Sequence, residues 1–260
     1  DCDWSSDVCS SDLEEAILMV IKTSVLAFSI ATMMCMGCTS INNKQLESLQ
    51  SPNLIWQPEA QLNWEQVKLP GKRDTQYSLV TLNGHKTLKA NAQSSASMLR
   101  QKIRIDPIAL NSLHFSWQVA ELMATADMAK RDQDDSPVRI VLAFEGDRKK
   151  FSMKNTMLSE LSHLVTGEPM PYATLMYVWC NNRPLNTVIE NPRTDRIRKI
   201  VVESGSERLN QWLTYERNIR ADYENAFGEA PGALIGIGLM TDTDNTQSHV
   251  QAWYGAIQLK

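Results

Sequence analysis

Residues 113–119 read LHFSWQV, and this stretch decides the fold class. Leu113, Phe115, Trp117 and Val119 are apolar, and the three residues between them are polar. Alternation with a period of two is typical of a β-strand that buries one face and exposes the other. We therefore expect a half-buried strand here.

Strand patterns recur on both sides of this stretch. Residues 77–82 and 85–92 flank the dipeptide Asn83-Gly84, which is a strong hairpin signal. Short runs of alternating or β-branched residues, separated by turn residues, continue to the C-terminus. These further predicted strands are residues 98–105, 138–144, 172–179, 185–189, 196–203, 234–241 and 248–259.

Two helical patterns interrupt the strands. Residues 153–165 place Met157 and Leu161 on one helical face, and residues 209–227 carry an aromatic stripe from Trp212 to Phe227 that we interpret as core packing. About ten strands and two helices predict an all-β protein. Specifically, we expect a β-sandwich of the jelly-roll kind with two accessory helices.

The first 18 residues differ in composition from the rest. Residues 3–13 read DWSSDVCSSDL, which has no apolar periodicity and equals the translation of a common sequencing adapter. We interpret residues 1–18 as an adapter-derived scar and exclude them from fold reasoning.

Residues 19–37 resemble a secretory signal peptide that ends at a lipidated cysteine. Lys22 precedes an apolar run over residues 25–36, and small Gly37 stands before Cys38. Gly37-Cys38 resembles a bacterial lipobox, with Cys38 as the lipid attachment residue, and Thr39 favours the outer membrane. We expect a lipid-anchored protein of a Gram-negative cell envelope that faces the periplasm.

Residues 38–62 are polar and contain two prolines, so we interpret them as a flexible tether, and residues 63–260 as one β-sandwich domain. The whole chain has a formal net charge of -4, but residues 1–37 hold six acids and one base. The remainder is close to neutral, which gives no case for nucleic acid as a partner. Cys180 is the one cysteine expected in the folded domain, so no disulfide is expected there.

Six blocks in the second half occur in an order that is typical of one family. They are DDSPVRIVLAFEGD (134–147), PYATLMYVW (171–179), RIRKIVVESG (196–205), DYENAFGEAPG (222–232), IGIGLMTDTDNT (235–246) and AWYGAIQL (252–259). From about Trp64 to Leu259 the chain resembles the bacterial domain-of-unknown-function family numbered 3047. Cys180 and Ala256 stand where the resemblance implies acidic residues. The resemblance implies a galactose-binding-like jelly roll and supplies no chemistry.

No catalytic motif and no metal-binding histidine spacing is found, so we predict no catalytic residue, no metal ligand and no cofactor. The acids at strand ends could act as a glycosidase pair or simply cap turns. Asp242 to Asn245 could hold a structural Ca²⁺ or form a plain loop. Arg193, Arg196, Arg198 and Lys199 could contact an anionic ligand or form a solvated strand face.

Aromatic residues could supply a stacking platform for a sugar ring, although aromatics on strands are usually core. Trp253 and Tyr254 are adjacent and must face opposite sides of a strand, so one of them is the better exposed candidate. Our predicted ligand-binding residues are Arg139, Glu145, Asp147, Trp179, Arg196, Arg198, Asp242, Asp244, Asn245 and Trp253.

Three functions fit these observations. The first is a non-catalytic module that binds carbohydrate or another polar ligand, which predicts a concave face with exposed aromatics. The second is a glycan hydrolase with two carboxylates in a cleft. The third is a structural lipoprotein that docks to a protein partner through an exposed apolar patch.

Overall fold

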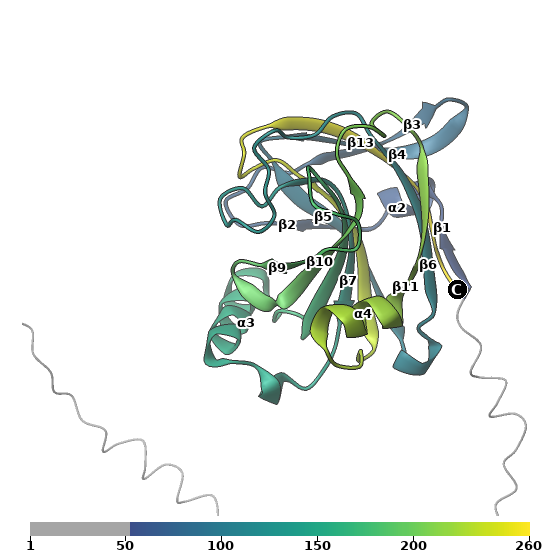
Figure 1. Ribbon diagram of the computed structural model, residues 1–260. Coiled ribbons are helices and arrows are strands. Elements are labelled where there is room, and N and C mark those ends of the chain that lie inside the picture. The colour runs from purple at the N-terminus through teal and green to yellow at the C-terminus, as the bar shows by residue number, and fades with distance from the viewer. Residues whose placement is uncertain (1–52) are drawn as a thin grey trace, which may run out of the picture. The chain divides into compact units, whose positions relative to one another are not determined.

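The LHFSWQV stretch forms the strand β6 (Ser112–Val119), and its alternation is used as predicted. Leu113, Phe115 and Trp117 are completely buried, whereas His114 and Ser116 are half-buried on the other face. The computed structural model describes residues 53–260, which form two facing β-sheets (Figure 1). β6 therefore has one side in the core between the sheets.

The first sheet has six strands and contains β6. Its order is β11-β6-β13-β4-β3, and β1 pairs with one end of β13. All of its strand pairs are antiparallel. The other strands of this sheet are β1 (Leu54–Trp56), β3 (Gln76–Leu82), β4 (His85–Gln93), β11 (Leu213–Asn218) and β13 (His249–Leu259).

The second sheet has seven strands in the order β2-β5-β12-β7-β8-β10-β9. Its pairs are antiparallel except for β8 and β10, which run parallel. The strands are β2 (Glu65–Lys68), β5 (Ala96–Ile105), β7 (Ser136–Phe144), β8 (Ala173–Cys180), β9 (Val188–Asn191), β10 (Thr194–Ser204) and β12 (Leu234–Asp242).

The core fills the space between the sheets. Phe115 of the six-stranded sheet stacks on Tyr177 of the seven-stranded sheet, with ring centroids 5.6 Å apart. The helix α4 (Ile219–Phe227) contacts β10 and β11 and covers one end of the sandwich (Figure 1), and its Tyr223 is fully buried. Such interlocking of large aromatic rings from both sheets favours this pairing of faces.

Two further helices lie at the edges. α2 (Pro58–Leu62) follows β1, and α3 (Met153–Thr166) lies beside β10 (Figure 1). Two short 3-10 helices, η3 (Pro107–Ala109) and η4 (Arg148–Lys150), complete the elements. No helix within residues 53–260 is long and apolar enough to cross a membrane.

The predicted fold class is confirmed, and each predicted strand corresponds to an observed one. The predicted helix over residues 209–227 is wrong in its first half, because residues 213–218 form β11 and pair with β6. The Asn218 side chain accepts a hydrogen bond from the Ala221 amide at 2.9 Å, and this N-cap starts the helix only at Ile219. Trp212 is 41% exposed, so the aromatic stripe is not one continuous core face.

The predicted tether extends too far. Residues 54–56 pair with β13 as strand β1, and residues 58–62 form α2, where the Gln61 side chain donates to the Gly255 carbonyl at 2.7 Å. These contacts make residues 54–62 part of the sandwich. The predicted scar, the signal peptide, Cys38 and the rest of the tether lie outside the described residues.

Candidate functional site

The ten ligand-binding residues predicted from the sequence do not lie in one place. Trp179 is 1% exposed in the core, and its indole N–H donates to the Gly205 carbonyl at 2.9 Å, so its assignment to a ligand surface is wrong. Glu145 forms an exposed ion pair with Arg104 at 2.6 Å. Asp147 accepts from the Lys149 amide at 3.0 Å and caps η4. These three positions have structural partners rather than a shared site.

The predicted basic cluster on β10 is also divided. Arg196 pairs with Glu229 at 2.9 Å and lies over the Tyr172 ring, while Arg198 pairs with Glu190 at 2.8 Å. Lys199 points to the opposite face of the strand and is fully buried. The interpretation of Lys199 as part of a solvated strand face is therefore wrong.

The structure does bring Arg139, Asp242, Asp244 and Asn245 together, where β7 begins and β12 ends. The Arg139 guanidinium is 3% exposed and binds Asp242 through Nε–Oδ1 and Nη2–Oδ2, both at 2.9 Å. A bidentate pair of this kind fixes both side chains. Asp242 is thus a buried structural partner of Arg139.

Asp134 extends this pair into a network that we call the buried ion network: Asp134, Arg139, Lys199 and Asp242. The Asp134 carboxylate accepts from Arg139 at 3.1 Å and from Lys199 Nζ at 2.6 and 2.7 Å. Lys199 Nζ also donates to the Met128 carbonyl at 2.9 Å. Burial lowers the pKa of Lys199 to about 8. A cation in this position depends on its single carboxylate partner.

A group of acids adjoins the network. Oxygens of Asp135, Asp242 and Asp244 lie within 4.8 Å of one another, and all three residues are buried. Such oxygens have the chemistry that Ca²⁺ prefers. However, Asp135 already accepts from the backbone and side chains of Asn245 and Thr246. Because protein donors satisfy these oxygens, the group does not support the Ca²⁺ alternative.

The Asp242 carboxyl is expected to make stability depend on pH. Burial raises its pKa to about 7, despite the attraction of Arg139, and Asp135 adds repulsion. In the unfolded chain its pKa is about 3.9, so between these values the native state holds a proton that the unfolded state has lost. This contribution to stability therefore falls as the pH rises toward 7.

Asn at position 242 cannot titrate, so Asp242→Asn isolates the effect. We expect the stability of the unsubstituted protein relative to this variant to fall as the pH rises from about 5 to about 7. Urea denaturation at several pH values measures it. Glu168→Gln is the control, because Arg100 and Lys102 lower the pKa of Glu168 to about 2. The stability difference between the unsubstituted protein and this variant should therefore not change between about pH 5 and pH 7. An equally flat difference for Asp242→Asn would contradict the prediction.

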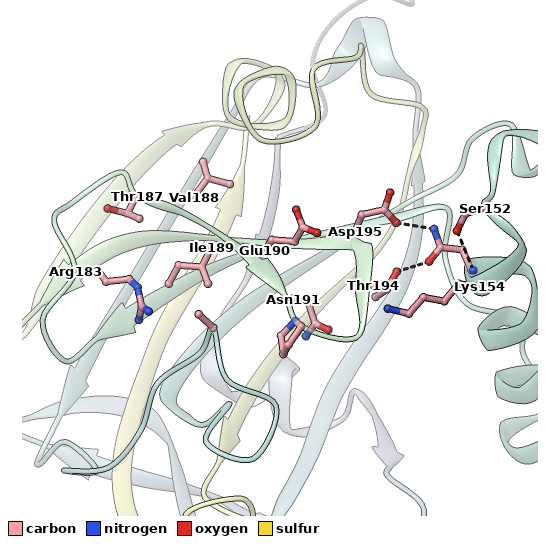
Figure 2. Close-up of a pocket in the computed structure, with 13 residues that line it drawn as sticks. Ser152, Lys154, Arg183, Thr187, Val188, Ile189, Glu190, Asn191, Thr194 and Asp195 are labelled. Atoms are coloured by element: carbon pink, nitrogen blue, oxygen red, sulfur yellow. Dashed lines mark hydrogen bonds between the residues drawn. The ribbon is translucent and has the colours of Figure 1, made fainter.

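A groove of about 580 Å³ lies between β9 and the start of α3 (Figure 2). We call it the β9 groove. Nine of its thirteen lining residues are polar or charged, and apolar atoms lie between their polar groups. The residues are Ala129, Ser152, Lys154, Asn155, Arg183, Thr187, Val188, Ile189, Glu190, Asn191, Pro192, Thr194 and Asp195.

One wall of the groove is held by Asn155, which is 2% exposed. Its side chain donates to Asp195 at 2.6 Å and accepts from the Thr194 hydroxyl at 2.7 Å. Its backbone N–H donates to the side chain of Ser152, the N-cap of α3 (Figure 2). These bonds join α3 to the β9–β10 turn. The wall is therefore set in place before any ligand arrives.

The floor of the groove rests on the buried ion network. Asn191 lines the groove, and its side chain donates to Asp134 at 3.1 Å. Asp134 in turn binds Lys199 and Arg139, as described above. The network thus fixes the position of Asn191 at the floor of the groove, and none of the four network residues lines the groove.

Charges of both signs remain at the groove surface. The Asn155 amide lowers the pKa of Asp195, so this exposed carboxyl stays ionised as an acceptor. Lys154 forms no ion pair within residues 53–260 and points into the groove toward Asn191 (Figure 2). Arg183 pairs with Asp127 at 2.6 Å. The groove can therefore both donate to and accept from a polar ligand.

Comparison with known proteins identifies the family. The model of the family described as "Protein of unknown function (DUF3047)" matches residues 62–258. The chain belongs to the DUF3047 family. The resemblance seen in the sequence blocks is confirmed. Among curated proteins, none matches this DUF3047 chain in sequence.

Solved structures show only distant likeness to the DUF3047 domain. Endoglucanase 3 of Trichoderma harzianum, from family GH12, has 7% identity and a TM-score of 0.40, with 74% of this chain and 88% of that one covered. The xyloglucanase domain of NopAA from Sinorhizobium fredii has 9% identity and a TM-score of 0.40, with 76% and 98% covered.

A glycoside hydrolase domain, endo-D from Streptococcus pneumoniae R6, has 10% identity and a TM-score of 0.33 over 76% of this chain. The chain spans only 22% of that protein. Likeness at this level does not decide function, so the function of the DUF3047 domain is argued below from its own residues.

Trp253 lies apart from the groove, on the outer face of the six-stranded sheet. It is half-buried, whereas Tyr254 is fully buried, so Trp253 is the more exposed of the two. Its cross-strand neighbours are Lys89, whose Nζ lies 5.7 Å from the ring centroid, and Gln118. Of the two predicted ligand-binding tryptophans, Trp253 is therefore the one on an outer face of the DUF3047 domain.

Sequence reasoning missed the β9 groove because its parts come from distant segments. Asn155 and Asp195 are 40 residues apart and carry no motif. It also missed Asp134 and Lys199 as partners, which are 65 residues apart. One signal was available: Lys199 directly precedes the apolar run Ile200 to Val202 of β10, where a buried neighbourhood is expected.

Proposed function

We propose that this protein is an envelope lipoprotein whose β-sandwich is a non-catalytic module for carbohydrate or another polar ligand, bound in the β9 groove. The observation that carries the proposal is the lining of the groove, which offers hydroxyl, amide, carboxylate and cationic groups on a fixed wall. Sugar hydroxyls both donate and accept hydrogen bonds, so they match such a lining. Anchoring through Cys38 at the outer membrane rests on the sequence alone.

The groove differs from the predicted site in one respect. We expected exposed aromatic residues at the binding surface, but no aromatic side chain is among the described residues that line the groove. Recognition there would rest on hydrogen bonds and charge instead of ring stacking. This favours a hydroxyl-rich or charged ligand over an apolar one.

The hydrolase alternative fits the groove less well. A glycosidase needs one carboxyl with a raised pKa to donate a proton to the leaving group. Asp195, one of the two carboxyls that line the groove, has a lowered pKa, and among residues 53–260 the carboxyl whose pKa is raised, Asp242, is buried in the ion network. The arrangement therefore supports binding rather than hydrolysis.

Two groove substitutions test the proposal. A glycan array of neutral and acidic oligosaccharides, probed with the full chain, is expected to identify a ligand, and calorimetry then measures its Kd. Lys154→Ala and Asp195→Ala should each raise Kd about tenfold or more, since a hydrogen bond to a charged group contributes about 1.5–3 kcal/mol.

Lys149→Ala is the matched control, because Lys149 is exposed but does not line the groove. Its Kd should equal that of the unsubstituted protein. Trp253→Ala gives a second comparison. If Trp253→Ala weakens binding and the groove variants do not, the binding surface is the six-stranded sheet and the groove assignment is wrong. Binding to no glycan, with a protein partner recovered instead, would contradict the whole proposal.

A further inference from the structure

The helix α3 carries an apolar stripe on its outer side. Met153, Met157, Leu161, Leu164 and Val165 recur at helical spacing and are 54–82% exposed. An amphipathic helix of a soluble domain normally turns such a stripe toward the core. Five large apolar side chains in contact with water on one helix are unusual for a free surface.

The inner side of α3 is polar instead. Asn155 and Ser159 are the buried residues of the helix, 2% and 5% exposed. Asn155 is tied to Thr194 and Asp195 of the sandwich, and Ser159 lies 3.5 Å from an Arg148 nitrogen. Because these bonds fix the rotation of the helix, the stripe cannot turn inward without breaking them.

Basic residues gather at the N-terminal end of the stripe. Arg148, Lys149 and Lys150 form η4 immediately before the helix, and Lys154 follows in its first turn. All four are exposed. Lys150 pairs with Glu229 at 3.6 Å, and Asp147 caps η4, whereas Arg148, Lys149 and Lys154 form no ion pair within residues 53–260. The stripe therefore carries a positive charge at one end.

We propose that α3 lies in the surface of a bilayer that contains anionic lipids. The apolar stripe would enter the boundary between headgroups and acyl chains, and the basic residues would contact the anionic headgroups. Long lysine side chains reach the headgroup level while their carbon chains stay near the apolar region. The basic residues at one end of the stripe complement an anionic lipid surface, which makes a bilayer the proposed occupant.

This inference goes beyond the proposed ligand binding and connects to it through geometry. Ser152, Lys154 and Asn155 belong to the start of α3 and also line the β9 groove. A bilayer under α3 would hold the mouth of the groove close to the lipid headgroups. Lys154 belongs to both surfaces, whereas Asp195 lines only the groove and Lys149 and Lys150 lie outside it, so substitutions at these positions test the two proposals separately.

The methionines of α3 report the contact directly. Limited oxidation of the full chain with hydrogen peroxide, read residue by residue by mass spectrometry, gives the rate of sulfoxide formation at Met153 and Met157. With vesicles of phosphatidylglycerol and phosphatidylcholine, these rates should fall about fivefold when roughly four fifths of the protein is bound, since only the unbound fraction reacts. Met98, half-buried on β5, is the internal control and should be unchanged.

Charge reversal tests the role of the basic end. The double variant Lys149→Glu with Lys150→Glu should lose the protection of Met153 and Met157. A matched double variant, Lys68→Glu with Lys86→Glu, changes two exposed lysines that lie on β2 and β4. This variant should keep the protection of Met153 and Met157. Protection of this kind in anionic vesicles, and weak protection in pure phosphatidylcholine, supports the proposal.

Three results would overturn it. The first is unchanged oxidation of Met153 and Met157 in anionic vesicles. The second is equal protection by neutral and anionic vesicles, which would show that charge plays no part. The third is protection that appears without vesicles as the protein concentration rises, which would assign the stripe to contact between two copies of this chain.

Discussion

Replacing Asp134 with alanine is expected to lower the free energy of unfolding by about 3–5 kcal/mol, because it leaves a buried cation without its partner. Lys199 is fully buried and has no other carboxylate within hydrogen-bond distance among residues 53–260. The Met128 carbonyl would remain as its only described acceptor. Denaturant unfolding followed by circular dichroism measures the loss.

Two further variants make this result interpretable. Glu145→Gln removes an ion pair of similar geometry with Arg104, but an exposed one, and should cost less than about 1 kcal/mol. Asp134→Asn combined with Lys199→Met removes both charges, so it should be less destabilising than Asp134→Ala alone. Equal losses for Asp134→Ala and Glu145→Gln would show that the buried ion network does not stabilise the fold.

Trp179→Ala is expected to lower the free energy of unfolding by about 3–5 kcal/mol, because the indole fills the core between the sheets. The substitution also leaves the Gly205 carbonyl without the indole donor. This residue was predicted to bind a ligand, so the same variant separates the two roles. Truncation of a core residue lowers the free energy of unfolding whether or not a ligand is present.

Trp253→Ala is the matched control, since Trp253 is the same residue type on the solvent face of the other sheet. It should cost about 1 kcal/mol or less. Thermal unfolding without ligand compares the two variants directly. If Trp179→Ala proves as mild as Trp253→Ala, the assignment of Trp179 to the core is wrong.

The fold could be predicted because its strongest signal is local. Alternation over a few residues, as in Leu113 to Val119, is enough to indicate a strand and its buried face. The first half of the helix predicted over residues 209–227 was wrong, because the three- and four-residue spacing of its aromatic residues also fits a strand followed by a capped helix. Asn218 decides between them through a side-chain hydrogen bond, which periodicity does not reveal.

The site could be predicted only in part, because it depends on pairing between distant segments. Asp242, an acid at a strand end, and Arg139 were both among the predicted ligand-binding residues, and they do meet. The partners that determine their role come from elsewhere: Asp134 from a loop, Lys199 from β10. Register and loop placement decide which charges are buried, and neither is encoded in a short motif.

The strand order has a consequence for how the chain is made. β12 and β13, the last strands of the described residues, lie inside their sheets: β12 between β5 and β7, and β13 between β4 and β6. During synthesis, neither sheet can close until residues 234–259 have left the ribosome. Earlier segments must wait with unpaired strand edges. The two sheets can therefore be completed only at the end of synthesis, when β12 and β13 insert between strands that were made much earlier.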